Sequence, residues 1–402
     1  MAQEEYILFT TDRFFAKKEI DQQYREHPEL FPADFSCGYV LNGFTEPSVK
    51  QGYRHRRIRL ATEKITFTIV PAFVMPYMTA LTKDIEKALF LRRFNVPYWG
   101  LTYAFGRNNM FWYRQEQAIG RFSIVGTTVK SPTTLPQDLL ADEKHTSRRG
   151  KKQYIAMTVA KECILGAELT ESASEFSLRK AYGVFADEAR SLNPNYAPES
   201  VNTDGWFPTQ NVWKNLFPNT AVILCFLHAF IKIRNRATKV LKESFAQASE
   251  KVWYAYKAEN KASFAQRLRR LKEWAAEQVP DSPMKEHIMD LCSKRKLFIK
   301  SYDHKNAHRT SNMVDRLMKF IDRACFDGMY FHGTLEAGNR RVRALALLWN
   351  FCPSSPATVK KHNGQICPAE RLNRKRYDDM WLNNLLVSAS MNGKSEYQQN
   401  PL

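Results

Sequence analysis

Residues 199–230 read ESVNTDGWFPTQNVWKNLFPNTAVILCFLHAF, and the predicted fold depends on this stretch. A short apolar run ends at Asp204 and Gly205, a helical segment follows at about 209–218, and a second apolar run begins at Ala221. This strand–helix–strand progression places polar groups at the carboxyl ends of neighbouring strands. Asp204 would lie at such an end, although an aspartate in a Thr-Asp-Gly turn commonly caps its own backbone.

The region before this stretch predicts three more strands and a helix. LPQDLLADEKHT, KKQYIAMTVA and CILGAELTE predict a three-stranded meander, and EFSLRKAYGVFADEARSLNP predicts a helix that stops at Asn193-Pro194. The resulting order, strand-strand-strand-helix-strand-helix-strand, is that of a ribonuclease H-like mixed sheet. The first and fourth strands of that sheet are neighbours, so Asp142, which we expect to close the first strand, would meet Asp204.

Two carboxylates held together at one sheet edge predict a metal site. Like charges repel strongly in a poorly screened site, and a divalent cation between them removes that cost. Oxygen ligands and retained waters suit Mg²⁺ or Mn²⁺, and such an ion can activate an attacking water or hydroxyl at a phosphodiester. We therefore expect Asp142 and Asp204 to bind magnesium or manganese.

A third carboxylate is expected after a long helical insertion at about residues 232–300, which is rich in Lys, Glu, Ala and Leu. Behind it, AHRTSNMVDRLMKFIDRACF predicts a helix capped by Ser311 or Asn312. Asp315 lies nearest the start of this helix, where the helix dipole favours a carboxylate. The alternatives for the third ligand are Asp322, Asp327 and Asp303.

Several of these motifs resemble the catalytic domains of DDE/D transposases, in particular the Mutator-like and related bacterial insertion-sequence families. The resemblance covers half of the chain, residues 136–335. It rests on the helical insertion and on three motifs: TDGW at 203–206, CFLH at 225–228 and RTSNMVDRLMK at 309–319.

The resemblance implies metal ligands at Asp142, Asp204 and Asp315. It also implies that His228 lies near the active site, contacting the scissile phosphate or steadying an acid. The chain departs from these families at two positions. The final acid is Asp where they usually have Glu, and Met318 stands in place of the second Asn of that motif.

Cys225 and His228 also allow half of a structural zinc site, but the remaining ligands would have to come from the widely spaced Cys352, His362 and Cys367. The seven cysteines are scattered and form no C-x-x-C pair, so we expect mainly reduced core thiols. His145, three residues after Asp142, is expected close to the acids.

The charge of the chain indicates a polyanionic partner. Its 402 residues include 60 Lys and Arg against 41 Asp and Glu, a net charge of +19. Nucleic acid fits this excess better than a membrane surface, because the basic residues are spread along the whole chain. The start, MAQEEYILFTTDRFF, lacks the basic and then apolar pattern of a secretory signal, so we expect a bacterial cytoplasmic protein associated with the nucleoid.

Residues 97–120, PYWGLTYAFGRNNMFWYRQEQAIG, have the spacing of a helix-turn-helix, with an ordinary helical hairpin as the alternative. The expected contacts to base edges and phosphates come from its polar side chains: Arg107, Arg114, Gln115, Gln117 and Arg121. A basic hairpin turn after Asp142 would meet the DNA backbone beside the metals through four more residues: Arg148, Arg149, Lys151 and Lys152.

We therefore predict a mixed α/β protein in three parts. These are a DNA-binding region at 1–135, a ribonuclease H-like catalytic domain at 136–335 with the helical insertion, and a helical tail at 336–402. The tail would pack on the catalytic domain or mediate self-association.

The predicted function is that of a transposase that cleaves transposon-end DNA and joins it to target DNA with two metal ions. It would act as a homo-oligomer on double-stranded DNA, away from membranes. The alternatives are a ribonuclease H-like nuclease without strand transfer, and a DNA-binding regulator derived from an inactive transposase.

Overall fold

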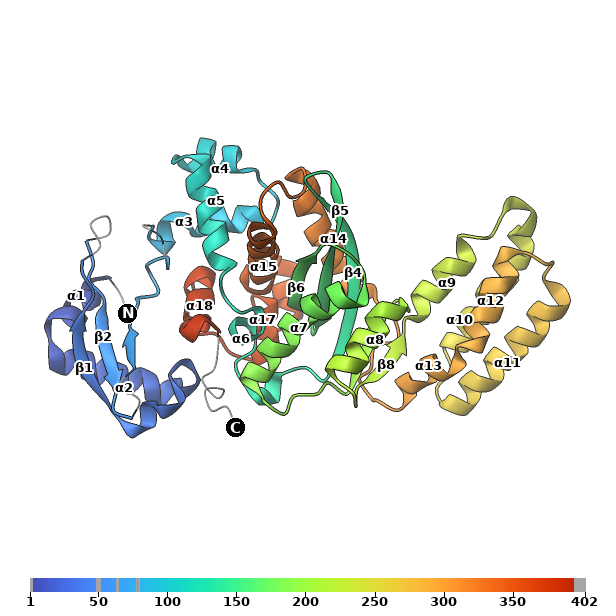
Figure 1. The fold of residues 1–402 in the computed structure, drawn as a ribbon, viewed down its shortest axis with the longest axis horizontal. Coiled ribbons are helices and arrows are strands. Elements are labelled where there is room, and N and C mark those ends of the chain that lie inside the picture. Colours follow the sequence, from blue (N-terminus) through green and yellow to red (C-terminus); the bar gives the residue numbers. More distant parts are fainter. Residues whose placement is uncertain (1–2, 48–51, 63–64, 77, 79, 394–402) are drawn as a thin grey trace.

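The computed structural model describes residues 3–47, 52–62, 65–76, 78 and 80–393. Three parts follow one another along the molecule: a small N-terminal unit, a central body built on a five-stranded sheet, and a helical arm (Figure 1). The predicted mixed α/β class is confirmed. Within the described residues, no helix is both long and apolar enough to cross a membrane.

The N-terminal unit packs two helices on a three-stranded antiparallel sheet in the order β1-β2-β3. Its elements are α1 (Gln3–Thr11), α2 (Arg13–Glu26), β1 (Tyr39–Phe44), β2 (Arg56–Leu60) and β3 (Thr66–Thr68). The basic run RHRRIRL, residues 54–60, contains β2. Arg56 is buried there and donates to the carbonyls of Phe9 and Thr10 at 2.8 and 3.0 Å.

The central sheet has the strand order β6-β5-β4-β7-β8. Its strands are β4 (Asp138–Arg148), β5 (Lys151–Ala160), β6 (Cys163–Thr170), β7 (Ser200–Thr203) and β8 (Ala221–Leu224). The first three are antiparallel, whereas β7 pairs in parallel with both β4 and β8. The predicted order of five strands and two intervening helices, α7 (Glu175–Leu192) and α8 (Phe207–Leu216), is confirmed.

Two strand boundaries differ from the prediction. β4 does not end at Asp142 but continues to Arg148, because its antiparallel pairing with β5 outlasts its parallel pairing with β7. The run AVILCFLHAF is a strand only as far as Leu224, since Cys225 caps a new helix, α9 (Phe226–Arg234).

Helices cover both faces of the sheet. Because side chains alternate along a strand, Leu139 and Ala141 of β4 pack under α7 and α8, while Leu140 faces the opposite side. That side is covered by α14 (Asn312–Asp327) and α15 (Leu335–Phe351). The short helix α6 (Ile124–Thr128) leads into the sheet.

The predicted tail packs on the central body. Helix α15 lies along the edge strand β6, where Asn350 bonds to the amide and carbonyl of Ile164 and Asn339 accepts from the amide of Leu169. These side chains occupy hydrogen-bonding groups that an edge strand otherwise leaves open. The remaining helices are α16 (Pro356–Lys361), α17 (Pro368–Asn373) and α18 (Trp381–Ser388).

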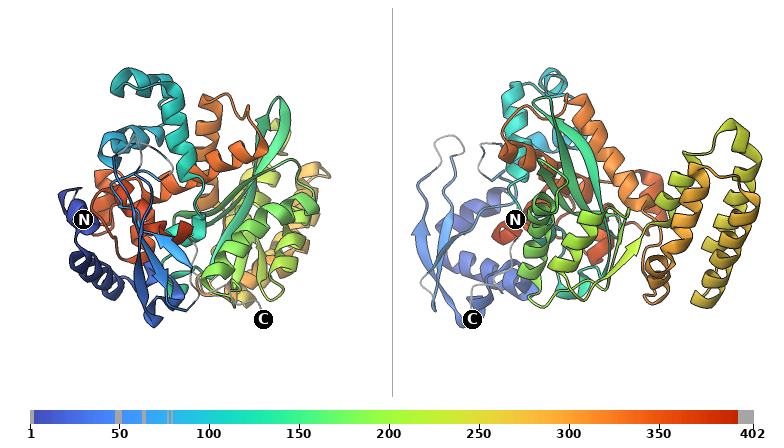
Figure 2. Two further views of the ribbon diagram at one scale, coloured as in Figure 1. Left: turned by 60° about the vertical axis from the view of Figure 1, so that its left-hand side comes forward. Right: turned by 45° about the vertical axis from the view of Figure 1, so that its right-hand side comes forward.

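The predicted helical insertion forms the arm, which stands away from the sheet (Figure 2, right). After α9 it comprises α10 (Lys242–Tyr256), α11 (Lys261–Gln278), α12 (Pro283–Ser293) and α13 (Arg295–Ile299). It has a core of its own that reaches back to Leu224 of β8 and includes Phe226, Phe264 and Phe298.

The predicted helix-turn-helix segment is a helical hairpin preceded by α3 (Thr82–Arg92). Helices α4 (Tyr98–Phe105) and α5 (Asn109–Ile119) are joined by the predicted turn, in which Asn108 caps α5 by accepting from the amide of Phe111 at 2.8 Å.

The expected role of Gln115 and Gln117 in reading bases is wrong. Their exposed fractions are only 1% and 9%, because α5 packs against α15. Gln117 donates to the carbonyl of Ala337 in α15 at 3.3 Å. Arg107, Arg114 and Arg121 are exposed. The outward side of the hairpin also carries large apolar side chains: Trp99, Tyr103 and Met110.

Candidate metal centre at the edge of the sheet

The candidate site is built by the parallel pairing of β4 and β7. Leu140 lies opposite Asn202 in the register, so Asp142 and Asp204 each follow two residues later at the same edge. The carboxyl ends of β7 and β8 and the start of α9 meet there.

Four predicted residues converge at this edge. Ligand atoms of Asp142, His228 and Asp315 all lie within 4.8 Å of one another. Asp142 also belongs to a second group of the same tightness, with Asp204 and Glu143. Asp142 is therefore the residue common to both groups, either of which could hold a metal ion.

The other acids weighed for the third ligand are engaged elsewhere or lie at a helix end. Asp322 forms an ion pair with Lys144 at 3.2 Å, and Asp303 forms one with Lys261 of α11. Asp327 is the last residue of α14 and is exposed. Asp315, in the first turn of α14, is the acid that reaches Asp142.

Glu143 is a residue of the site that the sequence does not predict. Neighbouring residues of a strand point to opposite faces, so Glu143 faces α7 and α8 while Asp142 faces α14. Its Oε1 accepts from the hydroxyls of Tyr182 and Thr209 at 2.6 and 2.7 Å. The only feature of the sequence that points to Glu143 is its position directly after Asp142, at the predicted end of a strand.

Asp204 caps its own backbone turn and also belongs to the acid cluster. Its Oδ1 accepts from the backbone amide of Trp206 at 2.8 Å, which makes the turn. Gly205 has φ +96°, a conformation that side-chain-bearing residues rarely adopt. The turn therefore fixes the carboxylate of Asp204 beside Asp142 and Glu143.

Ser311 connects the other half of the site. Its hydroxyl donates to Asp315 Oδ2 at 2.9 Å and lies 3.3 Å from His228 Nδ1. Its amide donates to Cys225 Sγ at 3.2 Å, so the cysteine contacts this network. Among the described residues, the groups that could hold a metal contain no cysteine, which leaves the zinc alternative without support.

Burial and mutual repulsion disfavour ionised carboxylates here. Burial, followed by the charge of Asp204, raises the pKa of Asp142 to about 7. Burial also raises the pKa of Glu143 to about 7, against the hydrogen bonds from Tyr182 and Thr209. A bound divalent cation would stabilise the ionised forms, so the cluster fits a metal ion.

The surroundings of His228 favour its protonated form. A hydrogen bond with the Cys225 side chain, with added attraction to Asp142 and Asp315, raises its pKa to about 9 despite burial. A protonated imidazole donates from both nitrogens, whereas a neutral imidazole can bind a metal ion. Without a metal ion, His228 therefore fits the role of a hydrogen-bond donor beside the acids.

The helical arm brings both basic and acidic side chains to the same edge. A small recess beside Asp204 and Gly205 is lined by Lys232 of α9, His287 of α12 and Lys294. Lys294 pairs with Asp290 at 2.7 Å. Among the described residues, Lys232 therefore lies beside Asp204 without an acid of the arm paired to it in the way that Asp290 is paired to Lys294.

The predicted basic hairpin and His145 both lie away from Asp142. The basic hairpin of Arg148, Arg149, Lys151 and Lys152 is at the far end of β4, about 20 Å from Asp142 at 3.3 Å per residue. Arg148 pairs with Glu171 at 2.9 Å. His145 is exposed, and its ring packs against Tyr154. It follows Asp142 by three positions, so its side chain lies on the opposite face of the sheet.

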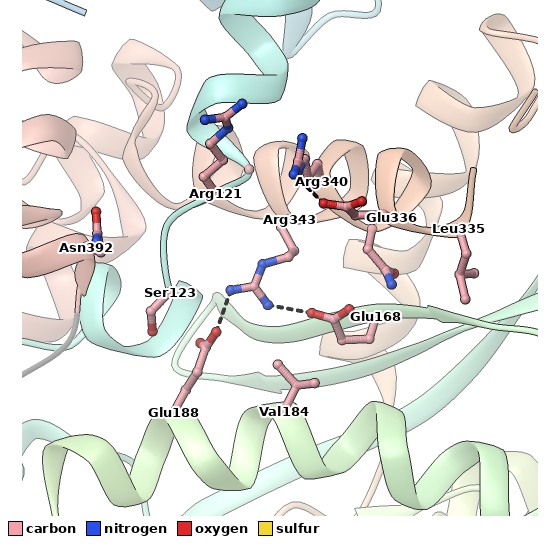
Figure 3. A pocket seen from close by; sticks show the side chains of 12 residues that line it. Arg121, Ser123, Glu168, Val184, Glu188, Leu335, Glu336, Arg340, Arg343 and Asn392 are labelled. Atoms are coloured by element: carbon pink, nitrogen blue, oxygen red, sulfur yellow. Dashed lines mark hydrogen bonds and ion pairs between the residues drawn. The ribbon is translucent and has the colours of Figure 1, made fainter. Parts of the chain in front are cut away.

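A hollow of about 710 Å³ lies elsewhere, between α7, α15 and β6 (Figure 3). Arg343 of α15 crosses it and pairs with both Glu168 of β6 and Glu188 of α7. The same guanidinium donates to the carbonyl of Phe122 at 2.9 Å. The hollow thus contains a largely buried ion-pair network that joins two helices to the sheet.

We expect Mg²⁺ to raise the thermal unfolding midpoint more at about pH 8 than at about pH 6. A carboxyl whose pKa is about 7 in the folded state and near 4 when unfolded makes the ion-free fold less stable as pH rises between those values. Cations bind the ionised carboxylates and remove that cost. Calorimetry with and without millimolar Mg²⁺ measures the difference, and an equal shift at both pH values would contradict it.

No family model matches the chain, and a search of curated proteins finds no significant relative.

Proposed function

We propose that this protein is a transposase that cleaves and joins DNA strands with divalent cations held in a ribonuclease H-like domain. The observation that carries the proposal is the convergence of Asp142, Asp204 and Asp315 at one sheet edge. These residues come from three distant parts of the chain, and the motif resemblance implies the same three.

The topology supports the ribonuclease H-like assignment. The order β6-β5-β4-β7-β8, with an antiparallel meander followed by two parallel strands, is the order expected for that fold. The helical arm enters between β8 and α14, where the resembling transposases carry their insertion.

The acids would hold one or two Mg²⁺ or Mn²⁺ ions, with Asp142 able to serve both positions. Such ions lower the pKa of an attacking water and neutralise charge on the phosphodiester. The Asp204 turn and the Ser311 hydroxyl keep the carboxylates in place. Cationic His228 can donate a hydrogen bond to a phosphate oxygen next to Asp142 and Asp315.

Double-stranded DNA is the proposed substrate. The net charge of +19 favours a polyanion, and basic groups of the arm lie beside the acids. The exposed Arg107, Arg114 and Arg121 can contact phosphates without reading bases. Bringing two transposon ends together would require a homo-oligomer.

The test is cleavage of labelled DNA that spans the ends of the element encoding this chain. We expect nicks that leave 3′ hydroxyls in Mg²⁺ or Mn²⁺ and none in EDTA, and a pre-cut end should join to a plasmid. Cleavage without joining would support the nuclease alternative instead. DNA binding with no cleavage in either metal would support the regulator.

A further inference from the structure

Three large aromatic side chains are exposed at the starts of the two helices that follow β6 and β7, and one of them, Trp206, is bonded to Asp204. Phe176 begins α7, and Trp206 and Phe207 lead into α8; their exposed fractions are 70%, 51% and 68%. Helix α7 follows β6 and α8 follows β7 (Figure 1). The register of β4 with β7 places Asp142 beside the end of β7, where Asp204 lies. We call these three residues the aromatic rim.

The aromatic rim has a fixed position relative to the acids. The backbone amide of Trp206 donates to Asp204, and its indole Nε1 donates to the carbonyl of Ala173 at 3.3 Å, in the connection before α7. Glu175 accepts from the side-chain amides of Asn211 and Asn215 at 3.1 and 3.2 Å, which ties α7 to α8. The rim residues therefore lie on connected elements and not on a free loop.

Positive charge accompanies the aromatic rim. The ammonium group of Lys180 lies 4.4 Å from the ring centre of Phe176, and Arg179 is exposed one residue before it. Residues three and four positions apart share one side of a helix, so these cations continue from Phe176 along the outside of α7. Aromatic faces next to cations are the combination that binds unpaired nucleotides.

On the basis of the proposed function, we propose that the aromatic rim binds an unpaired base of the DNA strand that is cut at the adjacent acids. In a duplex the faces of the bases are covered by their neighbours, so stacking on the rim needs a nucleotide that has left the helix. The charge of the chain and of the flanking cations favours a nucleic acid over an apolar protein partner. A base held two residues from Asp204 would fix which phosphodiester reaches the acids.

The test measures binding of the full chain, without divalent ions, to a duplex whose end carries a few unpaired bases, one of them 2-aminopurine. Stacking on the rim should quench its fluorescence. Trp206→Ala, Phe207→Ala or Phe176→Ala should weaken binding of this end by about 5- to 150-fold, and should reduce the quenching. Binding of a fully paired duplex should change little.

Phe326→Ala is the matched control, because Phe326 has an exposed fraction of 67% but lies in the last turn of α14. It should bind both DNAs like the unmodified protein. Trp206→Phe should restore part of the quenching, and thermal unfolding checks that each variant is folded.

Four results are informative. Selective loss in the rim variants supports the inference. Equal binding and quenching by folded rim variants and Phe326→Ala overturns it, even if metal-dependent cleavage is found. Equal weakening of paired and unpaired ends also overturns it. If the rim variants lose binding but the unmodified chain never cleaves DNA, the base site stands and the proposed function fails.

Discussion

Replacing Asp142 by asparagine should lower the rate of metal-dependent DNA cleavage by at least about 10³-fold. Asp142 is the residue shared by both candidate ligand groups, so its loss weakens each of them. Removing residues that only orient metal ligands already costs roughly 10- to 100-fold, and a shared ligand should cost more. Initial rates on labelled DNA in Mg²⁺ measure the effect.

The matched control for this prediction is Asp322→Asn. Asp322 is also an acid of α14, but it pairs with Lys144 outside the cluster. That variant should cleave within a few-fold of the unmodified rate. Asp142→Asn should also unfold at the same or a higher temperature without metal, because it removes repulsion with Asp204. Retained cleavage in Asp142→Asn would contradict the assignment of this residue.

Replacing Arg343 by methionine should lower the free energy of unfolding by about 3–5 kcal/mol. Arg343 pairs with Glu168 and Glu188 in a largely buried position (Figure 3). Methionine fills much of the same space but leaves two carboxylates without their cation. Urea unfolding followed by circular dichroism measures the loss.

The neighbouring Arg340 provides the control. It pairs with Glu336 one turn earlier on the exposed side of α15, so Arg340→Met should cost less than about 1 kcal/mol. Adding Glu168→Gln and Glu188→Gln to Arg343→Met should recover part of the lost stability. Equal losses for the two arginine variants would show that the Arg343 network does not hold α7 and α15 to the sheet.

Local patterns predicted most elements of the central sheet. Nearly continuous apolar runs separated by Lys161-Glu162 mark β5 and β6, and Asn193-Pro194 ends α7 where the sequence indicates. The C-terminal end of β4 could not be predicted, because its last residues pair only with β5 and extend past those that pair with β7.

The burial of Gln115 and Gln117 could not be predicted either. A polar pair on an amphipathic helix usually faces solvent, and the helix that covers it, α15, begins more than two hundred positions later. Packing between such distant segments leaves no mark in the local pattern of either one.

The candidate site was predicted in part. Strand order alone brings Asp142 to Asp204, and the motif resemblance selects Asp315 among four acids. Glu143 was missed because strand alternation directs it to the other face, where hydroxyls of Tyr182 and Thr209 reach it. The Ser311 hydroxyl contacts both His228 and Asp315. These contacts depend on side-chain positions that residue spacing in the sequence does not predict.

The central claim is that the acids at this sheet edge bind divalent cations. Anomalous diffraction from crystals soaked in Mn²⁺ tests it most directly, because manganese is located without reference to activity. We expect anomalous density among the carboxylates of Asp142, Glu143 and Asp204, with or without a second peak between Asp142 and Asp315. Manganese bound at other surfaces with none at Asp142 would contradict the claim.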